Sequence, residues 1–313
     1  MFEASSVDSN SNAANGSSSG TARPPVRPRA PRLGFEGVSR HWFAGSRAAT
    51  HIANGVNLLF PHGERFFIRS VRHYLDRVSP ELAAEVKGFF GQEGRHAQAH
   101  ERLFDTLRAQ GFDIDSILER YQRIAYDYIE KAAPPPLRLA VTVALEHFTA
   151  ILAEDALTGD SLAFADPQIR RLLEWHAVEE LEHKAVAFDV LEAVAPSYAL
   201  RLLGMAVATA TLGGFWLWAA NDLLRQDGSS LLDARRELAR LRARARREAG
   251  SRAVKVMEPI GSRVFLRGIL EYIKPGFHPM DRDHSALIAQ TLKRLADEGV
   301  VAPGNDDGHE SVS

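Results

Sequence analysis

Two short stretches of this 313-residue sequence share one chemical pattern, a glutamate followed three residues later by a histidine. The first stretch is QEGRH, Gln92 to His96, and the second is EELEH, Glu179 to His183. In a helix, residues three or seven positions apart point within one narrow arc, so Glu93, His96 and His100 share a face. Carboxylate and imidazole groups gathered on such a face can bind a metal ion.

A single pair of this kind has an ordinary alternative explanation, a solvated helix face with a hydrogen-bonded histidine. The second copy argues against this explanation. So do two lone glutamates upstream, Glu64, which lies 29 residues before Glu93, and Glu146, which lies 34 residues before Glu180. Burying four glutamates in a polar core without metal would cost several kcal/mol per uncompensated charge. We therefore predict that two metal ions are bound by Glu64, Glu93, His96, Glu146, Glu180 and His183.

The composition limits the ligands and partners of such a site. The chain contains no cysteine, which excludes disulfides, thiolate metal ligands and thiol nucleophiles. Carboxylate and imidazole ligands suit iron, with manganese and zinc as alternatives. A net charge of −2 gives no electrostatic reason to expect a nucleic-acid partner.

Composition along the chain predicts a folded helical protein with flexible ends. Residues 1–33 are rich in Ser, Asn, Gly, Pro and Arg and have no apolar run typical of a signal peptide, which predicts a disordered tail and a cytoplasmic protein. The rest shows frequent helix punctuation and almost no strand pattern. We predict an all-α fold with a ferritin-like four-helix bundle over 40–196. A hydrophobic helix, a basic helix and an extension follow over 197–290, and a helix end with a flexible tail over 291–313.

Proline, serine and glycine signals place the candidate ligands on four helices. An N-cap followed by proline begins two of them, at Ser79-Pro80 and Asp166-Pro167, and Gly111 and Gly159 end two. The expected helices, with a shorter one in third place, cover residues 61–78, 80–109, 115–131, 137–157 and 167–196. Four antiparallel helices can direct one glutamate from each of two helices, and a Glu-x-x-His from each of the other two, to a core that binds two metals.

This ligand pattern resembles that of the ferritin-like di-iron carboxylate proteins, and EELEH is similar to the acidic-Glu-x-Arg-His element of bacterial multicomponent monooxygenases. Residues from about 40 to 285 more closely resemble a bacterial family labelled metal-dependent hydrolases, through FPHGERFFIRSVRHYLDR, GQEGRHAQAHE, ALEHFTA, WHAVEELEHKAVAFDV and PGFHP. Gln92 and Glu182 depart from the monooxygenase pattern, which has an acid and an arginine there. That resemblance implies that Gln92 contacts His183 and that Glu179 contacts His96.

Three classes of function remain open. A carboxylate-rich site with two histidines stabilises oxidised iron, so an oxygen-activating di-iron oxidase or hydroxylase is expected first. The family label implies a metal-dependent hydrolase, which the same ligands could support. A non-catalytic metal-binding protein is the third class. His100 and His176 stay open between a role as extra ligands or proton carriers and that of ordinary hydrogen-bonded histidines.

The segment LLGMAVATATLGGFWLWAA, Leu202 to Ala220, has 19 residues without a charge and contains Trp216 and Trp218. Its length suits a membrane span, and tryptophans favour the membrane interface. The alternatives are a helix that covers the bundle, lines a substrate tunnel or forms a homodimer interface. The basic helix expected over 233–255 could contact anionic lipids. We therefore expect a hydrophobic substrate, such as a lipid, sterol or fatty-acid derivative, and consider association with the inner membrane.

Overall fold

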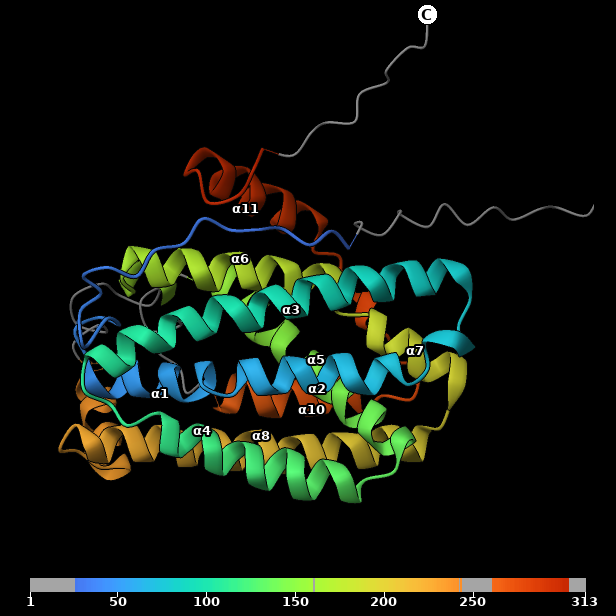
Figure 1. The fold of residues 1–313 in the computed structure, drawn as a ribbon, viewed down its shortest axis with the longest axis horizontal. Coiled ribbons are helices and arrows are strands. Elements are labelled where there is room, and N and C mark those ends of the chain that lie inside the picture. Colours follow the sequence, from blue (N-terminus) through green and yellow to red (C-terminus); the bar gives the residue numbers. More distant parts are fainter. Residues whose placement is uncertain (1–25, 160, 242, 244–260, 304–313) are drawn as a thin grey trace, which may run out of the picture.

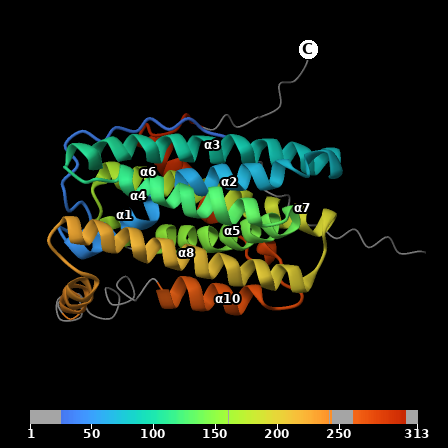
Figure 2. The same ribbon diagram turned by 60° about the horizontal axis from the view of Figure 1, so that its bottom comes forward.

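The computed structural model in Figure 1 describes residues 26–159, 161–241, 243 and 261–303. Helices make up most of this part of the chain, and the only β-type pairing found in it is a single bridge between Phe43 and Ala165. The all-α expectation is therefore confirmed. The long helices lie side by side along the long axis of the molecule (Figures 1 and 2).

Four long helices surround the centre of the molecule. They are α2 (Phe60–Arg72), α3 (Pro80–Ala109), α5 (Pro135–Thr158) and α6 (Pro167–His183). Helices α2 and α6 each pack against both α3 and α5, which closes a cycle of contacts. Proline occupies the first turn of all four helices, and the side chains of Ser79 and Asp166 cap α3 and α6. The punctuation read from the sequence therefore sets where these helices begin.

The last of the four predicted helices is interrupted. The sequence predicts one helix over 167–196, whereas α6 ends at His183 and α7 covers Val186–Val194. Glycine and proline are absent from the interruption, so the sequence carries no local signal for it. Instead, buried Lys184 donates through Nζ to Arg282 O at 2.6 Å and contacts His284 Nδ1 at 2.8 Å. Long-range contacts therefore hold this turn.

Further helices surround the four. They are α1 (Arg47–Asn57), α4 (Asp115–Tyr121) with a π-helical continuation (Gln122–Glu130), α8 (Tyr198–Gln226), α10 (Arg267–Tyr272) and α11 (Ser285–Asp297). Helix α8 packs along α5 and α1, and α11 lies on α6 (Figure 1). The sequence analysis did not predict α1. Residues 231–241 are helical, and most of the basic helix expected over 233–255 lies outside the described residues.

The helices α5 and α8 are both long and apolar enough to cross a membrane. In the most apolar window of α5, 72% of the residues are buried in the fold, against 28% in α8. Leu203 and Leu217 of α8 are 50% and 60% exposed. Core helices of soluble proteins meet the same length and composition criteria, so membrane association stays a prediction.

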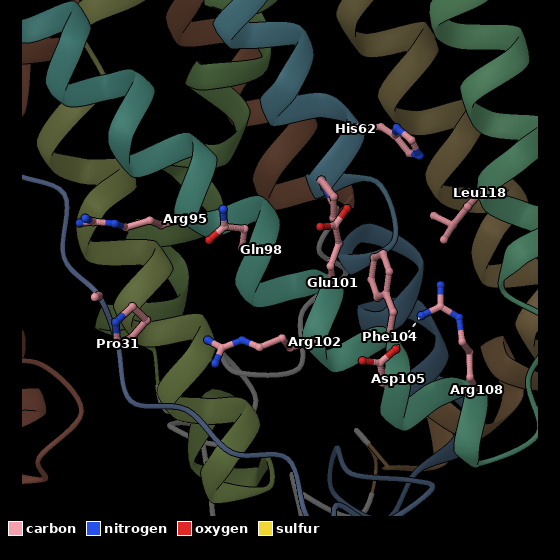
Figure 3. Close-up of a pocket in the computed structure, with 12 residues that line it drawn as sticks. Pro31, His62, Arg95, Gln98, Glu101, Arg102, Phe104, Asp105, Arg108 and Leu118 are labelled. Carbon is pink, nitrogen blue, oxygen red and sulfur yellow. Dashed lines mark hydrogen bonds and ion pairs between the residues drawn. The ribbon is translucent and has the colours of Figure 1, made fainter.

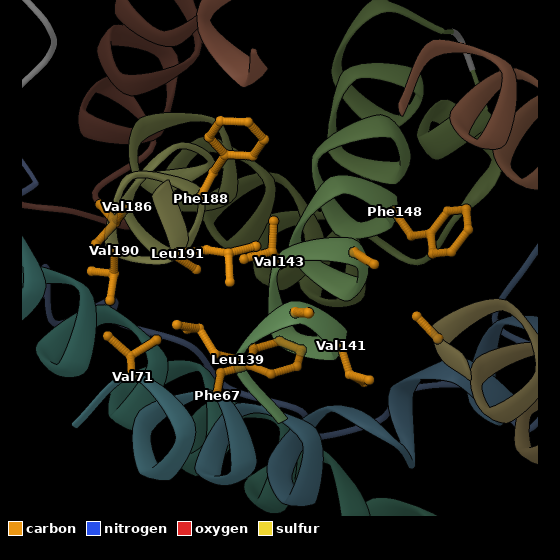
Figure 4. Close-up of a cluster of buried hydrophobic side chains, with 14 of the residues drawn as sticks. Phe67, Val71, Leu139, Val141, Val143, Phe148, Val186, Phe188, Val190 and Leu191 are labelled. Carbon is orange, nitrogen blue, oxygen red and sulfur yellow. The ribbon is translucent and has the colours of Figure 1, made fainter. Parts of the chain in front are cut away.

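The largest apolar cluster among the described residues joins α2, α3, α5, α7 and α8. It includes Phe67, Val71, Leu139, Phe188 and Leu191, all buried (Figure 4). Gly204 of α8 lies directly against the backbone of α5, where a Cβ atom would collide with Ala140 O. Glycine is therefore required for this close approach.

The segment 26–33 packs on the helices, although the sequence analysis assigned it to the disordered tail. It runs along α3 and α6 as the first coloured part of the chain in Figure 1. Gly88 and Gly91 of α3 make room for it, since a Cβ atom at these positions would collide with Val26 O and Pro28 Cγ. Arg32 N also donates to Val300 O at 2.7 Å, so segments near both ends of the described chain meet there.

Candidate metal centre

The six predicted ligands converge in the interior of the four-helix cycle. One comes from α2, two from α3, one from α5 and two from α6, and none is more than 3% exposed: Glu64, Glu93, His96, Glu146, Glu180 and His183. The spacing of three residues within α3 and α6 places each glutamate and histidine on one helix face. The two Glu-x-x-His pairs therefore face each other across the core.

Ligand atoms from different helices lie close together. His183 Nε2 is 3.0 Å from Glu93 Oε1 and 3.4 Å from Glu146 Oε2. His96 Nδ1 is 3.6 Å from Glu180 Oε1. Two sets of three residues place their ligand atoms within 4.8 Å of one another, Glu64 with Glu93 and His96, and Glu93 with Glu180 and His183. Glu93 belongs to both sets, and Glu146 reaches the cluster through His183.

Most of the atoms that face this centre have no hydrogen-bond partner among the described residues. These atoms are both carboxylate oxygens of Glu64, Glu93 and Glu146, together with Glu180 Oε2, His96 Nδ1 and His183 Nε2. His183 Nε2 and Glu93 Oε1 are close but are not aligned as a hydrogen bond. Unpaired buried carboxylates are costly. This arrangement therefore fits cations better than a hydrogen-bonded polar core.

The outer nitrogens of both histidines are held by neighbouring side chains. His183 Nδ1 lies 2.9 Å from Gln92 Oε1, and His96 Nε2 lies 3.1 Å from Glu179 Oε2. These are the two contacts that the monooxygenase resemblance implied. Since oxygen acceptors face these outer nitrogens, each histidine in its neutral form carries its proton there, and its inner nitrogen then has a lone pair that faces the centre.

Arg29 completes this outer layer, although the sequence analysis did not identify it. Its guanidinium donates two hydrogen bonds of 2.7 Å to Glu182, and its backbone N–H donates to Glu179 at 3.0 Å. Gln92 Nε2 in turn donates to Glu182 at 2.8 Å. A continuous chain of contacts thus runs from Arg29 to His183. Glu182 stands where the monooxygenase pattern has arginine, and the segment 26–33 supplies a guanidinium instead.

His100 and His176 extend the cluster toward α1. His176 Nε2 lies 2.8 Å from Glu180 Oε1, and His176 Nδ1 lies 2.7 Å from His100 Nε2. The His176 ring stacks on His96 with 4.1 Å between centroids, and Phe60 packs on both His100 and His176. Both histidines also belong to sets that could hold a metal. Their role as ligands or as proton carriers stays a prediction.

Without metal, the centre retains protons. Burial raises the pKa of Glu64 well above its usual value, and the neighbouring Glu93 carboxylate adds to the effect. Burial likewise raises the pKa of Glu146 to about 7. Burial opposes the charged form of His183, yet the Glu180 and Glu146 carboxylates raise its pKa well above the usual value. Metal ions can replace such protons, because ligands are deprotonated when they bind.

A largely apolar cavity of about 190 Å³ reaches the centre at Glu180 and His176. Its walls come from α1, α2, α5, α6 and α8 and include Phe60, Leu152 and Trp216. The cavity connects the candidate metal centre to a space for an apolar molecule.

Two other features are separate from this centre. A polar pocket of about 730 Å³ lies over the outer face of α3, where Arg95, Arg102 and Asp105 line it (Figure 3). None of the six candidate ligands is among the residues that line this pocket. Asp227, with His41 and His51, also has ligand-like spacing. Arg40 Nε donates to the same carboxylate at 3.0 Å, so this cluster is an ion-pair network.

Comparisons of the chain with curated proteins and with solved structures give no significant match. A family model described as "Predicted metal-dependent hydrolase" matches residues 27–283, which include Arg29 and all six candidate ligands. The chain therefore belongs to this family of predicted metal-dependent hydrolases.

Proposed function

We propose that the protein is a metal-dependent enzyme in which α2, α3, α5 and α6 form a ferritin-like bundle around two metal ions. The observation that carries this proposal is the convergence of four buried glutamates and two histidines whose inner atoms lack hydrogen-bond partners among the described residues. Two divalent ions would balance the four carboxylate charges. Glu93 belongs to both ligand sets and would help to hold both ions.

Hydrolysis is the reaction that the family description supports, and we propose it for this chain. Two divalent ions in such a site lower the pKa of a bound water and polarise a carbonyl or phosphoryl oxygen. Gln92 and Glu179 keep the two ligand histidines oriented. The His176–His100 pair, with 2.7 Å between its nitrogens, can carry a proton away from Glu180. The cavity beside Glu180 favours a substrate with a substantial apolar part.

Oxygen activation by two iron ions is the second candidate, and the ligand set favours it. Only two of the six ligands are imidazoles, and a site rich in carboxylates is hard and anionic, which stabilises oxidised iron. Iron held there would supply the electrons for oxygen reduction. The apolar cavity is compatible with oxidation or hydroxylation of a hydrophobic substrate.

Metal analysis tests the centre itself. Protein from cells supplied with iron, manganese and zinc is expected to contain close to two metal equivalents, and Glu93→Ala/Glu180→Ala is expected to lose them. Glu119→Ala, at an exposed position on α4, serves as the matched control. Stoichiometric metal in the double variant would reject the assignment.

A paired activity test separates the two reactions. Zinc- or manganese-loaded protein is assayed with apolar esters and phosphoesters, and reduced iron-loaded protein is assayed for rapid oxygen consumption coupled to iron oxidation. Ester or phosphoester cleavage that Glu93→Ala/Glu180→Ala abolishes would support hydrolysis. Oxygen consumption without any cleavage would replace hydrolysis with the second candidate.

A further inference from the structure

Asn57, the last residue of α1, carries a buried side-chain amide. The residue is 1% exposed, and neither Nδ2 nor Oδ1 has a hydrogen-bond partner within the described part of the chain. A buried amide left in this state costs roughly 1–3 kcal/mol, so most such groups are paired. Asn54, one turn earlier, differs from Asn57 because its Oδ1 accepts from Trp42 Nε1 at 2.9 Å, although its Nδ2 has no partner among the described residues.

Asn57 lines the same cavity that reaches Glu180 and His176. The cavity is therefore lined in one part by Asn57, whose amide has no partner among the described residues, and in another by Glu180, one of the candidate metal ligands. Between these groups the walls are mainly apolar, with Phe60, Leu152 and Trp216 among them. This combination of apolar walls and a few convergent polar groups is typical of small-molecule sites.

The size and charge of the cavity limit its ligand. Its volume of about 190 Å³ exceeds the ~150 Å³ of an apolar cavity that can hold benzene. Lysine and arginine are absent from the described residues that line it, whereas Asp155 and Glu180 contribute carboxyl groups. In the metal-free chain an anionic ligand would therefore find no lysine or arginine in this described lining.

We propose that this cavity is the substrate pocket of the metal centre and that Asn57 binds the polar group of the substrate. The ligand class is an apolar molecule about the size of one substituted ring, with a hydroxyl, carbonyl or amide group that pairs with the Asn57 amide. The amide suits such groups because it offers both donors and an acceptor. This inference rests on the proposed function, since the metal centre is what gives the Glu180 end of the cavity its chemistry.

Binding of matched probes tests the pocket. Benzyl alcohol and ethylbenzene differ only in a hydroxyl and a methyl group, and benzoate adds the negative charge. Calorimetry on the full chain, with and without zinc, gives the three dissociation constants. In Asn57→Leu we expect the preference for benzyl alcohol over ethylbenzene to fall roughly tenfold, the value of one lost hydrogen bond. In the zinc-free chain, benzoate should bind more weakly than benzyl alcohol, because no lysine or arginine is among the described residues that line the cavity.

Stability provides a second readout and a control. The Asn57→Leu variant removes no hydrogen bond, so its unfolding temperature should equal or exceed that of the unmodified chain. Thr142→Val breaks the 2.6 Å hydrogen bond with Ser70, and neither residue lines the cavity, so this variant should lower the unfolding temperature without changing the probe preference. An unchanged preference in Asn57→Leu, a clear loss of its stability, or no binding of any probe would overturn the inference.

The metal content of the same samples separates this inference from the proposed function. If the chain contains two metal equivalents but Asn57→Leu does not change the probe preference, the pocket inference is refuted and the metal centre is not. Binding that depends on Asn57 in a chain that retains no metal would support the pocket as a ligand site and refute the metal centre.

Discussion

Replacing Arg29 by methionine should destabilise the protein, although Arg29 lies outside every helix. The Arg29 side chain is 22% exposed and that of Glu182 is 2% exposed. The substitution removes two hydrogen bonds of 2.7 Å to the Glu182 carboxylate. Gln92 Nε2 then remains as a donor to that carboxylate. Breaking a buried ion pair costs about 3–5 kcal/mol. Since Arg29 is partly solvated and Gln92 remains, we expect about 2–3 kcal/mol, or a fall of roughly 5–8 °C in unfolding temperature.

Thermal unfolding followed by far-ultraviolet circular dichroism measures this effect. Arg32→Met is the matched control, because Arg32 lies in the same segment with an exposed side chain. Glu182→Gln removes the charge that Arg29 compensates. In the double variant Arg29→Met/Glu182→Gln, most of the lost stability should return, with a coupling energy of about 2 kcal/mol. Because the contacts continue through Gln92 to His183, Arg29→Met should also weaken metal binding roughly tenfold or more.

Two results would refute this reasoning. Equal stability losses in Arg29→Met and Arg32→Met would show that the ion pair does not hold the segment 26–33. Additive effects of the Arg29 and Glu182 substitutions would show that the two side chains do not depend on each other.

Three further predictions concern pH, the N-terminal segment and α8. In metal-free protein, Glu146 should contribute stability that is lost from about pH 5 to pH 8, because its pKa is raised to about 7 and the folded state therefore holds its proton longer than the unfolded state. Thermal unfolding should show this loss as a difference between the unmodified chain and Glu146→Gln, and added metal should abolish it. Gly88→Ala would collide with Val26 O and should speed tryptic cleavage near Arg29, whereas Gly94→Ala, with open space around it, should not. The unmodified chain should sediment with anionic lipid vesicles. The Leu217→Glu variant, changed at a position that is 60% exposed, should stay in the supernatant. An unmodified chain that also stays in the supernatant would contradict lipid binding.

The elements predicted best from the sequence are those with local signals. Helix α3 begins where Ser79-Pro80 predicts, because a side-chain cap and a missing amide hydrogen act within one turn. The spacing within both Glu-x-x-His motifs is also local, and it places both pairs in the core. Their convergence is a finding of the structure, and the metal that they would bind stays a prediction.

Features that depend on distant contacts could not be predicted in this way. Arg29 and Glu182 are separated by 153 residues, and the composition around Arg29 resembles that of a flexible tail. The interruption after His183 depends on Lys184 reaching Arg282, 98 residues away. Asn57 lies on a helix that the punctuation did not reveal, and only the packing of five helices around the cavity gives its amide significance.

The backbone hydrogen bond between Arg32 and Val300 brings two segments close in space that lie near opposite ends of the described chain. A chain whose ends are joined by a linker that leaves the segment 26–33 in place, and which is opened in the turn before α5, near Pro134, would preserve the helix contacts and reverse the order of the two halves. Each half contributes one lone glutamate and one Glu-x-x-His pair, so the centre does not require either half to come first. The geometry of the centre is therefore independent of the order of the two halves along the chain, and a circular permutant should assemble the same site.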